Sequence, residues 1–213
     1  MGLTTLGYQT EAAKGFNWMI SNQNIDGSWY SLYDDQQPIE FNKQTNHSSY
    51  LAVAAWHFFL LNKDIDFLQN HWESIKSGII FSLSLQNDNG AIAWNVDDKG
   101  EVDDDYLLTG CSSITKSLEC GIAICQILGH KNQEKEWRIA HAKLIKAIES
   151  PKGIFDLKKD RSKFSMDSYY PILGGISAKK MVSSLISNIK TTFWIKGLGI
   201  KCVSDEPWVT VAE

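Results

Sequence analysis

The stretch KGFNWMISNQNIDGSW, residues 14–29, decides the fold that we expect for this chain. Its first half carries Phe16, Met19 and Ile20 at the i, i+3, i+4 spacing that places apolar side chains on one face of a helix. An apolar face of this kind is typical of a helix that packs against a partner. The first half therefore predicts a helix in a layer of packed helices.

The second half of the stretch predicts how this helix ends. Asp26-Gly27 is a turn signal, because glycine adopts positive φ angles at little steric cost. Gln23 precedes the turn, at a helix end where its amide can donate to carbonyls that have no partner within the helix. We expect the ring of Trp29 to fold back over that end.

A weaker copy of the design follows at residues 77–94, SGIIFSLSLQNDNGAIAW, with Gln86, Gly90 and Trp94 in the corresponding roles. Gln86 comes 63 residues after Gln23, which is about the length of two helices with their loops. A repeat of this period indicates a chain built from helical hairpins. The predicted fold class is all-α, with repeated antiparallel helical hairpins forming an α/α toroid or an incomplete arc of one.

The first stretch resembles the glutamine–tryptophan repeat of terpene cyclases and protein prenyltransferases. In that repeat a basic residue and a glycine precede an aromatic residue or leucine, a glutamine, and then Gly-x-Trp. Met19 stands at the aromatic position, and the other positions are matched by Lys14, Gly15, Gln23, Gly27 and Trp29. The segments LLTGCSSI, KFSMDSYYPILGG and GLGIKCVSDEPWVT are similar to a bacterial group labelled prenyltransferase or terpene cyclase-like.

This resemblance covers nearly the whole chain and implies a toroid of the squalene-cyclase type. Such a toroid closes with about six hairpins, and the sequence predicts fewer. Residues 1–213 are therefore expected to form a single toroid domain that is incomplete at both ends.

The composition excludes several classes of protein. The chain is 43% hydrophobic and 22% charged, which is typical of a soluble globular protein. A net charge of −4 gives no electrostatic basis for binding nucleic acid. No apolar run is long enough to span a bilayer, and we expect no signal peptide, because the first residues have no basic region followed by an apolar core. Because the four cysteines show no paired spacing, we expect free thiols and a cytoplasmic protein.

Apolar periodicity and cap residues place the helices along the chain. Two long polar loops, residues 31–45 and 87–105, separate successive hairpins, so we expect function on one rim of loops. Helices are expected at residues 3–22, 46–61, 66–85, 112–128, 134–148 and 179–189.

The acidic loop at residues 101–105 contains the candidate acids Asp104 and Asp105. Its Glu-Val-Asp-Asp sequence resembles the Asp-x-Asp-Asp motif that protonates substrate in squalene–hopene-type cyclases, with glutamate in the first place. A carboxylic acid that protonates an alkene must stay neutral, which requires burial and like charges that raise its pKa. The alternative is an ordinary solvated run of charges.

Residues 163–175 give a more specific signal. Asp167 stands beside two phenols, Tyr169 and Tyr170, ahead of Gly174-Gly175. The carboxylate could serve as a general acid or base, while the rings stack on a sugar or a cation. In the alternative interpretation Asp167 caps a helix and both tyrosines pack in the core.

Near the C-terminus, Cys202, Asp205 and Trp208 combine a thiol, a carboxylate and an indole. Protein prenyltransferases, which the chain resembles, bind zinc through Asp, Cys and His. No histidine lies near these three residues in the sequence, so we predict no metal site and no cofactor. Asp205 stays a candidate acid.

Three functional interpretations follow. The leading one is a prenyltransferase or terpene cyclase-like enzyme that acts on an isoprenoid or a prenylated small molecule. The second is a six-hairpin glycosidase or related carbohydrate-active protein, whose helix–turn segment resembles residues 66–94. The third is a non-catalytic helical arc that binds a partner.

The spacing of the acids discriminates among them, because glycosidases need two carboxylates roughly 5–10 Å apart across a cleft lined with aromatic rings. The candidate acids are Asp104, Asp105, Asp167 and Asp205, and the candidate substrate-binding rings are Trp29, Tyr169, Tyr170 and Trp208.

Overall fold

Two glutamine side chains join the helices of this chain into a repeating arrangement. In the computed structural model, which describes residues 1–205, Gln23 Nε2 donates to the carbonyls of Gly27 at 2.9 Å and Ser74 at 3.0 Å. Gln86 Nε2 donates in the same way to Gly90 at 3.0 Å and Ala140 at 3.1 Å. Each glutamine therefore closes its own turn and ties that turn to a later helix, which confirms the predicted repeat.

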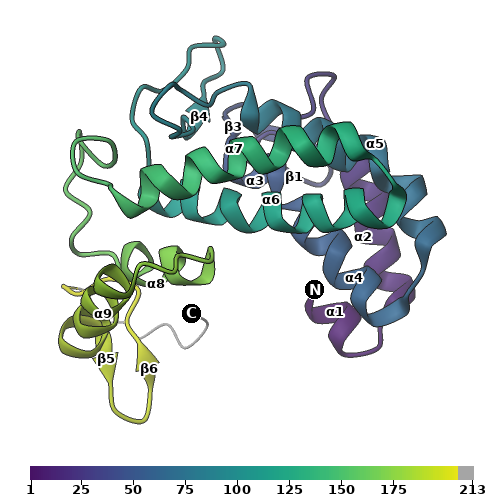
Figure 1. Ribbon diagram of the computed structural model, residues 1–213. Coiled ribbons are helices and arrows are strands. Elements are labelled where there is room, and N and C mark those ends of the chain that lie inside the picture. Colours follow the sequence, from purple (N-terminus) through teal and green to yellow (C-terminus); the bar gives the residue numbers. More distant parts are fainter. Residues whose placement is uncertain (206–213) are drawn as a thin grey trace.

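These contacts define an outer row of helices, and the inner row packs beside it (Figure 1). The outer helices are α2 (Gln9–Ser21), α5 (Ile65–Leu83) and α7 (Lys131–Glu149). The inner row consists of α3 (Thr45–Ser49) with α4 (Leu51–Asn62), α6 (Leu108–Leu128) and α8 (Met166–Leu173). Helix α6 packs against α4, α5, α7 and α8, so it lies at the centre of the hydrophobic core. The fold is the predicted all-α arrangement of helical hairpins of the α/α-toroid type.

The remaining elements are short. Helix α1 (Gly2–Thr5) precedes α2, and α9 (Lys179–Asn188) runs into the π-helical turn η1 (Ile189–Phe193). Among the described residues, strands pair antiparallel in three ladders: β1 (Leu32–Asp34) with β2 (Gln37–Glu40), β3 (Lys43–Gln44) with β4 (Asn95–Val96), and β5 (Trp194–Ile195) with β6 (Gly199–Ile200).

The long connections share one rim of the molecule. They run from each outer helix to the next inner one, over residues 22–44, 84–107 and 150–165, whereas the turns from α4 to α5 and from α6 to α7 are short. The β3–β4 ladder joins the first two connections. Because every long connection ends where an inner helix begins, the N-terminal ends of α3, α6 and α8 all face this rim.

Several helix boundaries differ from those that the sequence predicts. Helix α6 begins at Leu108, four residues before the predicted cap at Ser112. Ser112 lies inside the helix, where its hydroxyl donates back to the Leu108 carbonyl at 2.6 Å and does not cap the N-terminus. The predicted helix over residues 3–22 breaks at Gly7, whose φ is +87°. Within residues 1–205, no helix is both long and apolar enough to cross a bilayer.

Trp29 belongs to the core. Its indole Nε1 donates to the Met19 carbonyl at 2.7 Å, so the ring folds back over the end of α2, and the residue is 3% exposed. The two turns match, because the Gly27 amide donates to the Asn24 carbonyl and the Gly90 amide donates to the Asn87 carbonyl. Trp29 comes two residues after Gly27, and the residue two after Gly90 is the buried Ile92. Ile92, and not Trp94, therefore takes the position of Trp29 in the second turn. Trp94 lies on the rim instead, with the Lys159 ammonium 5.8 Å from its ring centroid.

The close approach at Gly90 yields a stability prediction. Gly90 has φ +91°, and a Cβ there would lie 2.5 Å from the Lys143 carbonyl oxygen. Gly100 has a similar φ of +86° but nothing within 4 Å, so it is a matched control. Gly100→Ala should lower the free energy of unfolding by about 1–2 kcal/mol through backbone strain. Gly90→Ala should lower it by about 1–3 kcal/mol more, because the added Cβ overlaps α7. Urea unfolding measures both, and equal losses would show that the turn does not need its contact with α7.

Candidate active site

Two aspartates contact one arginine where α6 and α8 begin, and a third aspartate acts electrostatically on one of them. Arg161 Nε lies 3.0 Å from Asp167 Oδ2 and 3.7 Å from Asp156 Oδ1. Asp105 immediately precedes Tyr106, whose carbonyl accepts from the Asp156 amide at 2.9 Å. We call Asp105, Asp156, Asp167 and Arg161 the carboxylate cluster.

The main chain fixes Asp156 in this cluster. Asp156 lies on the connection from α7 to α8, and its Oδ1 accepts from the Leu108 amide at the start of α6 at 3.4 Å. Its φ of +54° falls in the left-handed region, which aspartate tolerates better than most residues. The contact with α6 and the Tyr106 hydrogen bond hold this backbone conformation in place.

Asp167 is held by side chains on two elements. It lies in the first turn of α8, where the Thr109 hydroxyl donates to Oδ1. The Arg161 guanidinium donates to both oxygens, from Nε at 3.0 Å and Nη2 at 3.4 Å. Burial raises the pKa of Asp167, and the Arg161 charge opposes that rise.

Asp156 has the more unusual ionisation. Burial, followed by repulsion from Asp167, raises the pKa of Asp156 to about 6. Asp156 Oδ1 and Asp167 Oδ2 both contact Arg161 Nε, at 3.7 Å and 3.0 Å. The distance between these two carboxylate oxygens therefore cannot exceed the sum of the two contact distances. The pair therefore lies within the upper limit of roughly 10 Å that glycosidase carboxylates show. A carboxyl with a pKa near 6 can act as an acid in weakly acidic solution.

Asp105 brings a buried acceptor to the same place. The residue is 3% exposed, and its Oδ2 has no hydrogen-bond partner among residues 1–205. A buried oxygen without a donor costs free energy, so such an atom calls for a partner from solvent or a ligand.

Two cavities are each lined in part by residues of α8. The first has a volume of about 380 Å³ and contacts the cluster through Asp156, Arg161 and Asp167. The second, which we call the tyrosine pocket, has a volume of about 310 Å³ and is lined by Tyr50, Ser112, Ser113, Lys116, Tyr169 and Tyr170. The rings of Tyr169 and Tyr170 lie 5.2 Å apart and tilted by 39°.

A glycine sets the position of these tyrosines. A Cβ on Gly174 would lie 2.5 Å from the Ser112 carbonyl oxygen, so α8 approaches α6 at main-chain distance. The Thr115 hydroxyl donates to the Gly174 carbonyl at 2.7 Å and fixes that approach. The two tyrosines are thereby placed beside Ser112 and Ser113 of α6.

The other candidates from the sequence lie elsewhere. The Asp104 side chain is exposed and pairs with Lys158, and Asp205 is exposed with one oxygen 3.7 Å from Lys163 Nζ. Trp29 presents no ring face to a ligand because it is buried in the core. Trp208 lies outside the described residues. Of the candidate acids, only Asp105 and Asp167 lie in the cluster.

Sequence reasoning missed Asp156 and Arg161. Asp156 and Arg161 stand in a charged segment, DLKKDRSK, in which no spacing singles them out. Only the position of that segment between two helices points to the rim. Within residues 1–205, no group of three His, Cys, Asp or Glu side chains is placed to hold a metal ion.

No protein-family model matches the chain. A curated relative, MMP endo-(1,4)-3-O-methyl-alpha-D-mannosidase of Mycolicibacterium hassiacum, is 35% identical over 213 residues, which is 100% of this chain. The chain spans 58% of the length of that relative.

Solved structures show the same fold. A rhamnosidase from Klebsiella oxytoca with rhamnose bound matches 78% of this chain and 34% of its own, with a TM-score of 0.57 and 11% identity. The alpha-L-rhamnosidase from Dictyoglumus thermophilum matches 83% of this chain and 21% of its own, with a TM-score of 0.59 and 15% identity. At these identities the likeness shows the fold alone.

These comparisons overturn the expected membership of the prenyltransferase and terpene cyclase class, and with it the leading functional interpretation. The relative is named as a glycosidase, which favours the second interpretation. The physical reason for the error is visible in the turns. Gln23, Gly27 and Trp29 all bond or pack within the helical scaffold, so the motif indicates hairpin packing and carries no information about a substrate.

The arginine of the cluster can be tested by unfolding. Arg161→Gln should lower the free energy of unfolding by about 1.5–3 kcal/mol, because two half-buried carboxylates lose a charged donor. The loss should grow from pH 5 to pH 8, since Asp156 and Asp167 then ionise without a counter-charge. Arg138→Gln is the control, because its ion pair with Glu134 is exposed to solvent and should contribute little to the free energy of unfolding. A loss that stays constant with pH would contradict the described cluster.

Proposed function

We propose that this chain forms the catalytic part of a glycoside hydrolase, with the carboxylate cluster at its active centre. The observation that carries the proposal is the pairing of two half-buried carboxylates across one arginine, where burial and mutual repulsion raise the pKa of Asp156 to about 6. Glycosidases need such a pair, one member protonated and one ionised.

The geometry favours a role for each carboxyl. Arg161 is closer to Asp167 than to Asp156, so its charge favours an ionised Asp167 and a neutral Asp156. In the proposed reaction Asp156 donates its proton to the glycosidic oxygen as the bond to the anomeric carbon breaks. Asp167 then stabilises the positive charge that develops on the sugar ring, directly or by activating water. Asp105, with its unpartnered oxygen, supplies an acceptor for a substrate hydroxyl.

The relative supports a substrate class. Its name describes an endo-acting enzyme for (1,4)-linked 3-O-methyl-α-D-mannose, so we propose an α-linked mannoside chain as the substrate here. The tyrosine pocket is lined by residues of α8 that follow Asp167 in the helix, and it offers tyrosine rings together with hydroxyl groups. Sugar rings bind to such surfaces through their apolar faces and their hydroxyls. Tyr169 and Tyr170 are therefore proposed as substrate-binding residues.

Substitution of the proposed acid tests this function. The wild-type chain should release reducing ends from a (1,4)-linked α-mannan that carries 3-O-methyl groups, and Asp156→Asn should lower kcat roughly 10²–10⁴-fold. Asp104→Asn is the matched control, because this aspartate is exposed and pairs with Lys158 outside the cluster, and its kcat should match the wild type. Circular dichroism checks that the variants fold. An Asp156→Asn variant with wild-type kcat would refute the role of Asp156.

The pH dependence of the reaction gives an independent prediction. The proposed acid must carry its proton, so kcat should fall as the pH rises through about 6, the pKa of Asp156. Measurement of kcat between pH 4.5 and 8 under substrate saturation, at roughly half-unit intervals, tests this limb. Activity that rises from pH 6 to pH 8 would contradict the assignment of Asp156 as the acid.

A further inference from the structure

The charges of this chain are unevenly distributed, with a basic segment at residues 168–204. This segment contains five lysines and no aspartate or glutamate, although the whole chain has a net charge of −4. Four of the lysines are exposed to solvent, namely Lys179, Lys180, Lys190 and Lys196. Among residues 1–205 none of these four forms an ion pair, whereas lysines elsewhere, such as Lys158, pair with carboxylates. Their positive charge is therefore available to a partner.

The same elements expose apolar side chains. Helix α9, the turn η1 and the β5–β6 hairpin form this surface, which we call the basic face, and none of the ten residues of α9 is fully buried. A hollow of about 520 Å³ on the basic face is lined by Ile186, Ile189, Lys190, Trp194 and Ile200. Side chains that remain apolar and exposed in this way indicate a surface for interaction.

The β5–β6 hairpin carries the most exposed of these side chains. It extends beyond α9, away from the two rows of helices (Figure 1). Trp194 is 55% exposed at the start of β5, and Leu198 is 54% exposed in the turn that its amide closes on the Ile195 carbonyl at 3.0 Å. Lys196 lies in the same turn. An indole suits a boundary between water and hydrocarbon, and a lysine can lay its hydrocarbon stem along such a boundary while its ammonium stays in water.

We propose that the basic face docks on a bilayer surface that contains anionic lipids, with the tip of the hairpin among the headgroups. Charge complementarity selects this partner, because each lysine near an anionic bilayer strengthens binding by roughly 5-fold. The exposed Trp194 and Leu198 side chains would leave water at the boundary of the acyl chains. A nucleic acid would also attract the lysines, but it would offer no hydrocarbon to Ile186 and Leu198. This inference does not depend on the proposed function.

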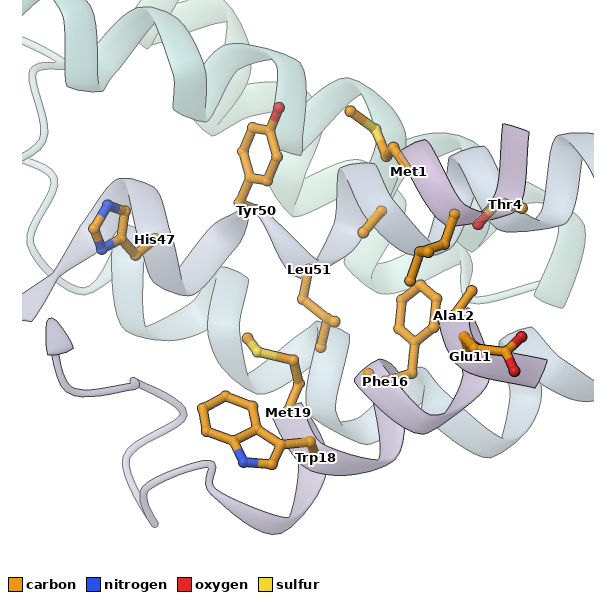
Figure 2. Close-up of a pocket in the computed structure, with 13 residues that line it drawn as sticks. Met1, Thr4, Glu11, Ala12, Phe16, Trp18, Met19, His47, Tyr50 and Leu51 are labelled. Carbon is orange, nitrogen blue, oxygen red and sulfur yellow. The ribbon is translucent and has the colours of Figure 1, made fainter. Parts of the chain in front are cut away.

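A second apolar surface provides a control. The pocket between α1, α2, α3 and α4 has a volume of about 570 Å³, and its lining includes Phe16, Trp18 and Met19 (Figure 2). Among the described residues that line it, Glu11 is acidic and none is lysine or arginine. If apolar exposure alone drove adsorption to lipid, this pocket would contribute as much as the hairpin. The proposal requires apolar and basic side chains together, so it predicts no contribution from the pocket.

Cosedimentation with lipid vesicles tests the proposal. The wild-type chain should bind vesicles of phosphatidylcholine mixed with phosphatidylserine, and it should bind pure phosphatidylcholine vesicles far more weakly. Lys190→Gln combined with Lys196→Gln should weaken binding to the mixed vesicles roughly 10–30-fold. The matched control is Lys131→Gln with Lys135→Gln, which makes the same change of net charge at exposed positions of α7 and should leave binding unchanged.

A second pair of variants tests the apolar contribution. Leu198→Ser should weaken binding to the mixed vesicles, whereas Leu3→Ser, at a 47% exposed residue of the apolar pocket, should not. Circular dichroism checks that all variants fold. Absence of binding to mixed vesicles, or equal binding to both kinds of vesicle, would overturn the proposal. A wild-type dimer in sedimentation velocity that Leu198→Ser dissociates would assign the face to a second copy of the chain, and would also overturn it.

Discussion

The structure depends on a glutamine amide that donates two hydrogen bonds at the end of an outer helix. One bond closes the local turn, and the other reaches a carbonyl 51 residues later for Gln23 and 54 residues later for Gln86. Each such bond contributes only about 1 kcal/mol, but its geometry is specific. It can form only where the turn glycine lets the main chain approach the next outer helix, as Gly27 does at Ser77 and Gly90 at Lys143.

This repeated contact explains where the chemistry lies. Because each outer helix is tied to the next one, every long connection must return to an inner helix on the same side of the molecule. Asp105, Asp156 and Asp167 come from two such connections and from the first turn of α8, and they meet where α6 and α8 begin. The helix N-termini, with their partial positive charge, are favourable positions for carboxylates. The turn residues stabilise the packing of the helices, and the residues of the rim position the reactive groups.

The same separation explains what could be predicted from the sequence. The repeat was predictable because Gln23 and Gln86 mark it by local spacing, and the structure confirms it. The family was not predictable, since the residues of the motif form hydrogen bonds and packing contacts with main-chain groups that any such hairpin has. Asp167 stands out in the sequence beside two tyrosines and does lie in the cluster. Asp156 carries no sequence signal, because its ionisation comes from burial and from Asp167, which only the tertiary fold brings near.

The most direct test of this account is the ionisation of Asp156 in the folded chain. Carbon-13 NMR of aspartate carboxyl groups, assigned by comparison with Asp156→Asn, would follow its titration. The account predicts a titration near pH 6, which moves down when Asp167→Asn removes the neighbouring charge. A titration near the ordinary aspartate value of about 3.9 would contradict it, because Asp156 would then be ionised throughout the range in which a glycosidase acid must hold its proton.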